Sequence, residues 1–266
     1  MRRIIIIIIV LILIDALLIE PNVIVTKELE IESDKISNAF EGIKIIHISD
    51  LHIKRSGLRE NWLISTIRSR EPDILIISGD FFERNEDIED VKLFIENLKR
   101  EVNVSIIATL GNWDYWSGNP EGLTKILEEN GIQLLKNQNI EYGRGGDFIN
   151  IIGADDPYTG QDDIEKATLW LNREKFTILI AHAPDIINHL ENEKFDLILT
   201  GHTHGGQVYL PFIGAPWTPT ETQYIRGMYE TKNGKLYVNR GIGTSTFPVR
   251  FMSLPEVTII TLKKSY

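Results

Sequence analysis

The sequence predicts an α/β fold, and three features support this prediction. Apolar runs of strand length alternate along the chain with segments that have helical spacing. Several of these runs, such as 74–77 and 197–199, are apolar at every position, as is typical of strands buried on both faces of a sheet. Polar residues follow directly after several of these runs, and ligand sites of α/β sheets lie beyond the carboxyl ends of the strands.

Length and composition indicate one large folded domain. The chain has 266 residues, of which 42% are apolar and 25% are charged. Its formal net charge of −10 disfavours a nucleic-acid partner, although metal ions would let such a protein bind a small anionic substrate. The absence of cysteine excludes disulfides, thiolate metal sites and a cysteine nucleophile.

Residues 1–21 are predicted to be an N-terminal membrane anchor. Arg2 and Arg3 precede Ile4–Ile19, which Asp15 alone interrupts. This run would span about 24 Å as a helix, somewhat less than a comfortable membrane span. A cleaved signal peptide and a buried core element are the alternatives, but no small-residue cleavage site follows the run. The basic residues before the run predict a single span with the main domain outside the cell membrane.

Residues 22–42 are expected to form a linker and a first strand, and residues 43–266 the main domain. The first half of that domain begins with alternating strands and helices. In order, these are a strand at 43–49, a helix at 57–70, a strand at 73–78, a helix at 88–100, a strand at 104–110 and a helix at 120–130.

The second half is expected to be richer in strands. Two strands, 132–142 and 148–153, flank a glycine-rich turn, and Asp155-Asp156-Pro157 is interpreted as a second turn. A strand at 176–181 precedes a helix at 185–193, in which His189 is interpreted as a surface or packing residue. A strand at 197–199, a hairpin around Asn233-Gly234 and a closing strand at 257–262 complete the chain.

Seven metal-competent side chains follow these strands. On an extended backbone, residues i and i+2 face the same side, so an Asp-x-His or His-x-His pair is expected to point into one space. Together the seven would surround two divalent ions, and their mixture of nitrogen and oxygen donors suits Mn, Fe or Zn. They are Asp50, His52, Asp80, Asn112, His182, His202 and His204.

The order of these motifs resembles the calcineurin-like metallophosphoesterases, whose pattern is D-x-H, G-D, G-N-H-D, a strand-end histidine and G-H-x-H. The resemblance implies a four-layer sandwich of two mixed β-sheets flanked by α-helices, and hydrolysis of phosphate esters or anhydrides. It assigns Asp50, His52, Asp80 and His204 to the first metal. It assigns Asp80, Asn112, His182 and His202 to the second, so that Asp80 bridges the two. Two such ions would supply a bridging hydroxide near neutral pH.

One departure from the family pattern concerns the leaving group. Trp113 stands where the family has a histidine, and an indole N–H donates a hydrogen bond but is no acid near pH 7. The lack of an acid at this position favours substrates whose leaving group has a low pKa. Pyrophosphates and phosphodiesters of activated alcohols are such substrates, whereas alkyl monoesters are not. Asp114 remains a candidate catalytic residue, because the family uses it to orient the missing histidine. Trp113 and Arg250 are candidate substrate-binding residues, although Arg250 is equally compatible with a structural ion pair.

Short motifs follow the histidines: Gly205-Gly206-Gln207, Arg226-Gly227, residues 238–245, Arg250-Phe251 and Pro255-Glu256-Val257. In these motifs the chain resembles a bacterial, membrane-associated branch of the family, which includes UDP-2,3-diacylglucosamine pyrophosphatases of lipid A biosynthesis. An apolar loop, Pro211–Trp217, follows the last histidines, and Phe212, Ile213, Pro216 and Trp217 are expected to form a lip over the site; a loop packed on the core is the alternative. We therefore expect a membrane-associated phosphodiesterase or pyrophosphatase with a lipid-linked or amphiphilic substrate. There are three alternatives: a UDP-2,3-diacylglucosamine pyrophosphatase, a nuclease, and a metal-binding scaffold with little turnover.

Overall fold

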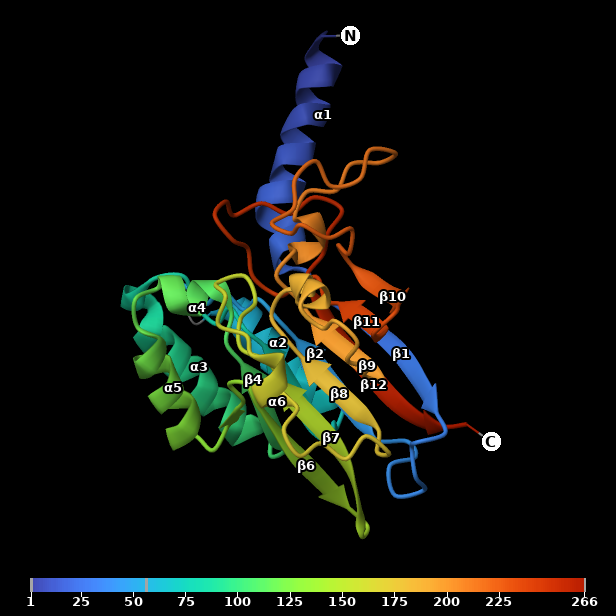
Figure 1. Ribbon diagram of the computed structural model, residues 1–266. Helices are drawn as coiled ribbons and strands as arrows, with labels where there is room; N and C mark the ends of the chain where they lie inside the picture. The colour runs from blue at the N-terminus through green and yellow to red at the C-terminus, as the bar shows by residue number, and fades with distance from the viewer. Residues whose placement is uncertain (1, 56, 266) are drawn as a thin grey trace.

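Two six-stranded sheets packed face to face form the body of the molecule (Figure 1). The computed structural model describes residues 2–55 and 57–265. In spatial order, the first sheet contains β1 (Val25–Ser33), β12 (Glu256–Lys264), β2 (Lys44–Ile48), β3 (Ile74–Ser78), β4 (Ser105–Thr109) and β5 (Gln133–Leu134). The second contains β10 (Gly227–Thr231), β11 (Gly234–Val238), β9 (Leu197–Thr200), β8 (Thr177–Ile180), β7 (Asp147–Gly153) and β6 (Gln138–Arg144).

Both sheets are mixed, which confirms the predicted sheet type. β2, β3 and β4 are parallel to one another, and β12 is antiparallel to β2. β7, β8, β9 and β11 are parallel, and hairpins add β6 and β10 at the two edges. Within each sheet the parallel strands end level with one another, because Ile48 pairs with Ile77 and Ile180 pairs with Leu199. Loops from both sheets therefore begin at the same edge of the sandwich (Figure 1).

Alternate residues of the strands face opposite layers, which produces three cores. The central core lies between the sheets and includes Ile45 and Ile76 of the first sheet and Ile178 and Leu199 of the second. A second core lies between the first sheet and the helices α2 (Leu58–Ser69), α3 (Ile88–Glu101) and α5 (Pro120–Glu129). A third covers the other face of the second sheet. These layers confirm the predicted four-layer sandwich.

The cover of the second sheet is thinner than predicted. It includes the short helix α6 (Ile164–Ala167) and the 3₁₀-helix η4 (Pro184–Asn188). The helix predicted at 185–193 is therefore wrong beyond Asn188. His189 instead caps η4, and its Nδ1 lies 2.7 Å from a carboxylate oxygen of Asp162 at the surface.

The strand predicted at 132–142 is also wrong as a single element. β5 and β6 belong to different sheets, and the chain crosses between them at residues 135–137. Asn137 has a left-handed φ of 53°, and its side chain bonds the backbone of Asp155, Gln161 and Asp163. Leu135 faces the central core from this crossing, so apolar residues continue through the break and hide it in the sequence.

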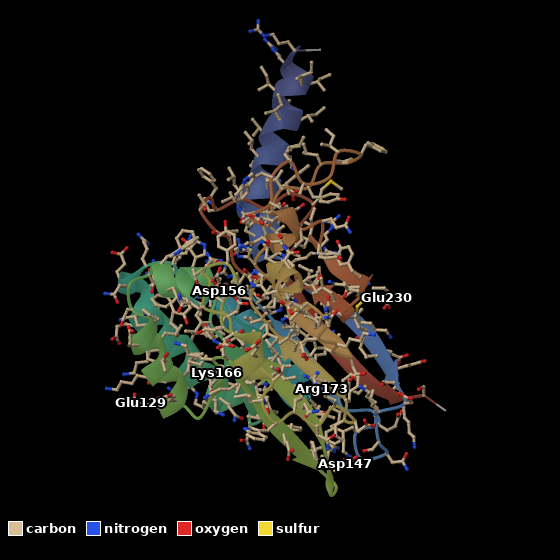
Figure 2. The ribbon with its side chains drawn as sticks, in the orientation of Figure 1. Glu129, Asp147, Asp156, Lys166, Arg173 and Glu230 are labelled. Atoms are coloured by element: carbon tan, nitrogen blue, oxygen red, sulfur yellow. The ribbon has the colours of Figure 1, made fainter. Side chains whose placement is uncertain are left out.

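The N-terminal helical segment projects from the end of the sandwich where the strand-end loops gather (Figure 1). It consists of α1 (Arg2–Ile14), the π-helical turn η1 (Asp15–Ile19) and the 3₁₀ turn η2 (Glu20–Asn22). The large apolar side chains of α1 are exposed (Figure 2), whereas Ala16 and Pro21 pack on the body. β1 follows at once and pairs with β12 along its whole length.

Candidate metal centre

The candidate ligands follow strand ends, as predicted, but their backbone is not extended. β2 ends at Ile48 and β9 ends at Thr200, before either motif begins. Five ligands instead have left-handed backbone angles, which is uncommon for residues with a side chain and concentrates at functional sites. These angles are φ 51° at Asp50, 41° at His52, 57° at Asp80, 68° at His202 and 51° at His204. The ligands therefore converge because tight turns direct them inward, and the predicted extended geometry is wrong.

Two clusters of buried ligands result, and they divide the His-x-His pair between them. Asp50, His52 and His204 form one cluster, and the Nε2 atoms of His52 and His204 lie 3.1 Å apart. Asp80, His182 and His202 form the other. There, His202 Nδ1 lies 3.1 Å from His182 Nε2. The structure thus brings six of the seven predicted ligands together in two groups, and their assignment to two metal sites, with Asn112 in the second and Asp80 in both, stays a prediction.

Asp80 lies between the clusters. Its Oδ2 atom is 3.5 Å from His52 Nε2 and 3.2 Å from His182 Nε2. Its Oδ1 atom accepts a hydrogen bond from the backbone N–H of Trp113 at 2.9 Å. One oxygen is thus held by the neighbouring turn while the other faces both clusters, which is the placement expected of a bridging carboxylate.

The protonation of the buried ligands suits a pair of cations. Burial lowers the pKa of His202 to about 3, so this imidazole is neutral at pH 7 and free to bind a metal. Burial also lowers the pKa of His182, but the carboxylates of Asp80, Asp50 and Asp156 together outweigh burial and raise that pKa well above its usual value. The site therefore favours positive charge beside Asp80, as a bound cation would supply.

Two buried polar atoms without hydrogen-bond partners also indicate that the site suits metal cations. Asn112 Oδ1 and His202 Nε2 are buried and have no hydrogen-bond partner among the described residues. Buried polar groups in proteins are otherwise nearly always paired, so an unpaired amide oxygen at this place is consistent with a missing ligand. The donors, four imidazoles with carboxylate and amide oxygens, are those of a Mn, Fe or Zn site.

The turns that carry the ligands pack closely against one another, with the backbone of one turn in contact with its neighbours. Gly79 has a φ of 80°, and a Cβ atom there would lie 2.6 Å from the Gly111 nitrogen and 2.7 Å from His182 Nδ1. At Gly201 a Cβ atom would collide with the side chains of Ser49 and Asp50. The glycines of the G-D and G-H-x-H motifs therefore leave no room for a side chain beside the ligands.

Groups outside the two clusters face the outer nitrogens of two imidazoles. Glu83 Oε1 lies 3.2 Å from His52 Nδ1 without the geometry of a hydrogen bond, while the other Glu83 oxygen pairs with Lys54 at 2.9 Å. His182 Nδ1 lies 2.8 Å from the carbonyl oxygen of Ser78, which orients Nε2 toward Asp80. Such outer partners hold a metal-binding imidazole in one tautomer. Sequence reasoning missed Glu83, because it stands in a loop three residues after Asp80 and no strand-end pattern marks it.

Asp114 and Arg250 have contacts that favour positioning roles. The Asp114 carboxylate accepts hydrogen bonds from the backbone N–H groups of Asp80, Phe81 and Gly111, at 2.9, 2.7 and 2.9 Å. The Arg250 guanidinium is fully buried, donates to the carbonyl oxygens of Arg240, Gly243 and Ser253, and lies 3.3 Å from His204 Nδ1. Neither lines the cavity described next, so a direct role for either in catalysis or substrate binding stays a prediction.

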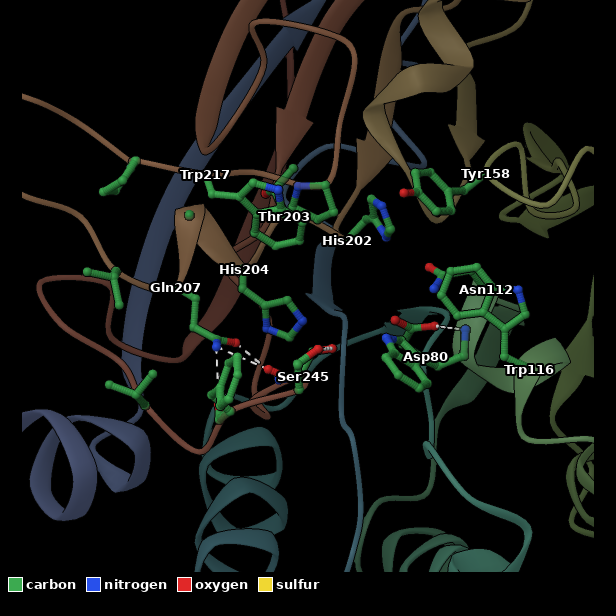
Figure 3. A pocket seen from close by; sticks show the side chains of 18 residues that line it. Asp80, Asn112, Trp116, Tyr158, His202, Thr203, His204, Gln207, Trp217 and Ser245 are labelled. Carbon is green, nitrogen blue, oxygen red and sulfur yellow. Dashed lines mark hydrogen bonds between the residues drawn. The ribbon is translucent and has the colours of Figure 1, made fainter.

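A cavity of about 490 Å³ opens over the second cluster (Figure 3). Asp80, Asn112, His202 and His204 line its floor, and aromatic rings form much of its wall. No lysine or arginine is among the described residues that line it. The wall includes Trp113, Trp116, Tyr158, Trp217 and Phe247.

The cavity wall differs from the predicted lip in two residues and contains one aromatic residue that was not predicted. Pro216 and Trp217 line the cavity as expected, but Phe212 and Ile213 do not, and both are exposed. Tyr158, which sequence reasoning missed, has its ring 4.5 Å from that of His202 (Figure 3). It belongs to the Asp155-Asp156-Pro157 turn, and only its position in the fold brings it to the site.

Comparisons with known proteins agree with this geometry. The family model for calcineurin-like phosphoesterases matches residues 43–206. The uncharacterised metallophosphoesterase YkuE of Bacillus subtilis is 33% identical over 254 residues, which cover 93% of this chain and 88% of that protein. A zebrafish (Danio rerio) transmembrane protein with a metallophosphoesterase domain is 28% identical, over 90% of this chain and 57% of its own length. The structure of Haemophilus influenzae NAD nucleotidase superposes with a TM-score of 0.50 at 18% identity, over 76% of this chain and 45% of that chain.

Proposed function

The chain belongs to the calcineurin-like phosphoesterase family, and we propose that it hydrolyses a phosphodiester or pyrophosphate bond of an amphiphilic, lipid-linked substrate. The family and its similarity to metallophosphoesterases make it a metal-dependent phosphoester hydrolase. The observation that carries the narrower proposal is the cavity. It joins the metal centre to an aromatic wall, so a phosphate group and an apolar group can be held side by side.

The proposed roles of the residues follow from their places. Asp50, His52, Asp80 and His204 would hold one divalent ion, and Asp80, Asn112, His182 and His202 a second. When bound, two such ions supply positive charge to the phosphoryl group and make hydroxide available near neutral pH. The Trp113 backbone N–H holds one oxygen of Asp80, which keeps the other directed at both clusters.

The leaving group narrows the choice of substrate. Trp113 carries an indole N–H on the cavity wall, with its ring 6.4 Å from that of His52, and an indole is no acid near pH 7. Leaving groups of low pKa need no such acid. The absence of a lysine or arginine from the described wall favours a diester, which has one negative charge, over a diphosphate. A UDP-diacylglucosamine pyrophosphatase is therefore the second candidate.

A membrane location is part of the proposal. The helical segment Arg2–Asn22 is 21 residues long and apolar enough to cross a membrane, and a similar protein of zebrafish is named a transmembrane protein. Hydrogen bonds join the base of this segment to the body. The backbone N–H of Arg250 donates to the Ala16 carbonyl oxygen at 2.9 Å, and the backbone N–H of Met252 donates to the Glu20 carboxylate at 2.8 Å. These contacts support an uncleaved anchor. Arg2 and Arg3 support an external domain, which would separate it from cytosolic nucleotide sugars.

A substrate screen tests the proposal. The full-length chain, loaded in turn with Mn²⁺, Zn²⁺ and Fe²⁺, is assayed with bis(p-nitrophenyl) phosphate, an alkyl phosphate monoester, a pyrophosphate diester and a phospholipid. We expect hydrolysis of diesters or pyrophosphates above that of the monoester. A preference for the monoester would contradict the interpretation of Trp113. No turnover with any metal, together with tight metal binding, would favour the scaffold alternative.

A further inference from the structure

Five exposed apolar side chains lie in two loops at the end of the molecule from which α1 projects. They are Phe212 at 108% exposure, Ile213 at 74%, Trp217 at 73%, Phe247 at 68% and Met252 at 48%. We call these five residues the tip surface. In Figure 1 both loops lie at the end from which α1 projects, one drawn in orange and one in red. Exposed apolar side chains gathered in this way mark interaction surfaces.

Hydrogen bonds join the two loops to each other. Gln207 Nε2 donates to the carbonyl oxygens of Ser245 and Phe247, each at 3.1 Å. Val208 and Phe251 form a β-bridge between the same two segments. The loops therefore present their apolar side chains from one connected structure.

The second loop is also bonded to the N-terminal segment. Arg250 N donates to Ala16 O, and Glu20 accepts from the backbone N–H groups of Met252 and Ser253 at 2.8 and 3.3 Å. These bonds hold η1 and η2, at the base of α1, against the loop that carries Phe247 and Met252. A lipid bilayer that receives α1 must lie next to these loops.

The composition of the loops fits a lipid surface. Residues 208–220 and 241–249 contain no charged side chain, in a chain of which 25% of residues are charged. Phenylalanine and tryptophan are typical of segments that enter the boundary between headgroups and acyl chains. A surface for a soluble protein partner normally has a rim with charged side chains, which these two stretches lack.

We infer that the tip surface contacts a phospholipid bilayer and holds the mouth of the cavity against it. Trp217 and Phe247 belong both to the tip surface and to the cavity wall. A substrate with its acyl chains in the bilayer would then present its phosphate to the metal centre without leaving the membrane. This inference rests on the anchor described under the proposed function, but it requires no knowledge of the substrate.

Site-specific fluorescence tests the inference, because the natural chain has no cysteine. Phe212→Cys and Trp170→Cys each place one thiol for an NBD label on the full-length chain. Trp170 is a matched control: it is 97% exposed and apolar but lies beside Gln138 and Asn139 of β6. Each labelled protein is reconstituted in vesicles of phosphatidylethanolamine and phosphatidylglycerol, with and without nitroxide-labelled lipid.

We expect nitroxide lipid to remove about half of the emission at position 212 and little at position 170, since a contacting loop sits at headgroup depth. Equal quenching at the two positions would overturn the inference. The label at position 212 could instead be shielded from water more strongly at higher protein density, with no effect of nitroxide lipid. This result would also overturn the inference, because it would indicate that a second copy of the chain covers the tip surface. Both variants should keep wild-type hydrolysis of bis(p-nitrophenyl) phosphate, which reports that they fold. Phe212→Cys combined with Asp80→Ala should show the same quenching, so membrane contact and catalysis are tested separately.

Discussion

Asp80 and Trp113 are joined by one hydrogen bond but have different parts in the centre. The Trp113 backbone N–H fixes the Asp80 carboxylate, whereas its indole belongs to the cavity wall, with its ring 6.4 Å from that of His52. The main chain of residue 113 thus positions Asp80, and its side chain lines the cavity. A change of side chain at this position should alter substrate preference and leave the metals in place.

The first prediction concerns this side chain. Trp113→His places an imidazole at the cavity wall, where it can protonate a leaving alkoxide. General acid catalysis contributes about 10²–10⁴-fold, so we expect the variant to gain at least about tenfold in kcat for an alkyl monoester relative to bis(p-nitrophenyl) phosphate. Steady-state kinetics with both substrates measures the ratio, and an unchanged ratio would show that residue 113 is remote from the leaving group.

The second prediction concerns the orientation of His52. Glu83→Gln removes the charge that faces His52 Nδ1, and loss of such a partner commonly costs about 10–100-fold in metal affinity. Metal titration of the full chain measures the affinity. Glu86→Gln is the control, because Glu86 is exposed and pairs with Arg84. Equal affinity in the two variants would assign Glu83 to the surface pair with Lys54 alone.

At the scale of the elements, Asp114 joins the turn after β3 to the turn after β4. Its two oxygens accept three backbone N–H groups from these turns, which carry Asp80 and Asn112. Burial and the neighbouring Asp80 raise the pKa of Asp114 to about 8, while the N–H donors act in the opposite direction. The relative position of the two turns therefore depends on this carboxyl group.

The third prediction follows from that connection. Asp114→Asn replaces one accepting oxygen by an N–H₂ group that faces a backbone donor, which costs about 1–3 kcal/mol for a buried group left unpaired. We expect a lower free energy of unfolding in urea and weaker binding of metal by the second cluster. Asp34→Asn, an exposed change of the same kind, serves as the control. Full stability of Asp114→Asn with a selective loss of kcat would restore a catalytic role for Asp114.

The sequence indicated the buried strands and the candidate ligands for a definite physical reason, whereas the sandwich was predicted only from the family resemblance. Strands buried on both faces are apolar throughout, so a polar residue just after one stands out, as at Asp50, Asp80 and His182. The left-handed turns could not be predicted, because backbone angles at non-glycine residues depend on the surrounding packing. The split between β5 and β6 escaped notice because Leu135 keeps the run apolar across it. Tyr158 reaches the cavity only through tertiary contacts.

At the scale of the whole molecule, buried groups between the sheets make stability depend on pH. His47 of β2 is fully buried, its Nε2 lies 2.8 Å from Ser78 Oγ, and burial lowers its pKa to about 3. The unfolded chain takes up a proton here below pH 6.5 and the folded chain does not. This group therefore contributes its full stability above pH 6.5 and loses it as the pH falls toward about 3.

The fourth prediction measures that contribution. His47→Gln removes the titration, so wild type should lose about 2 kcal/mol more stability than the variant between pH 7.5 and pH 5. Urea unfolding at both pH values, with saturating metal, gives the four free energies. Equal pH dependence in the two proteins would mean that His47 is protonated in the folded state.

The most direct measurement is the number of divalent ions per chain together with diester hydrolysis, in wild type and in Asp80→Asn. Elemental mass spectrometry of the metal-loaded chain should give two ions in wild type and fewer in the variant, because Asp80 Oδ2 faces both clusters. The kcat for bis(p-nitrophenyl) phosphate should fall by at least about 10²-fold, since two-metal hydrolysis needs both ions. A wild-type chain that is active with one ion, or an Asp80→Asn variant with two ions and full activity, would contradict a two-metal centre bridged by Asp80.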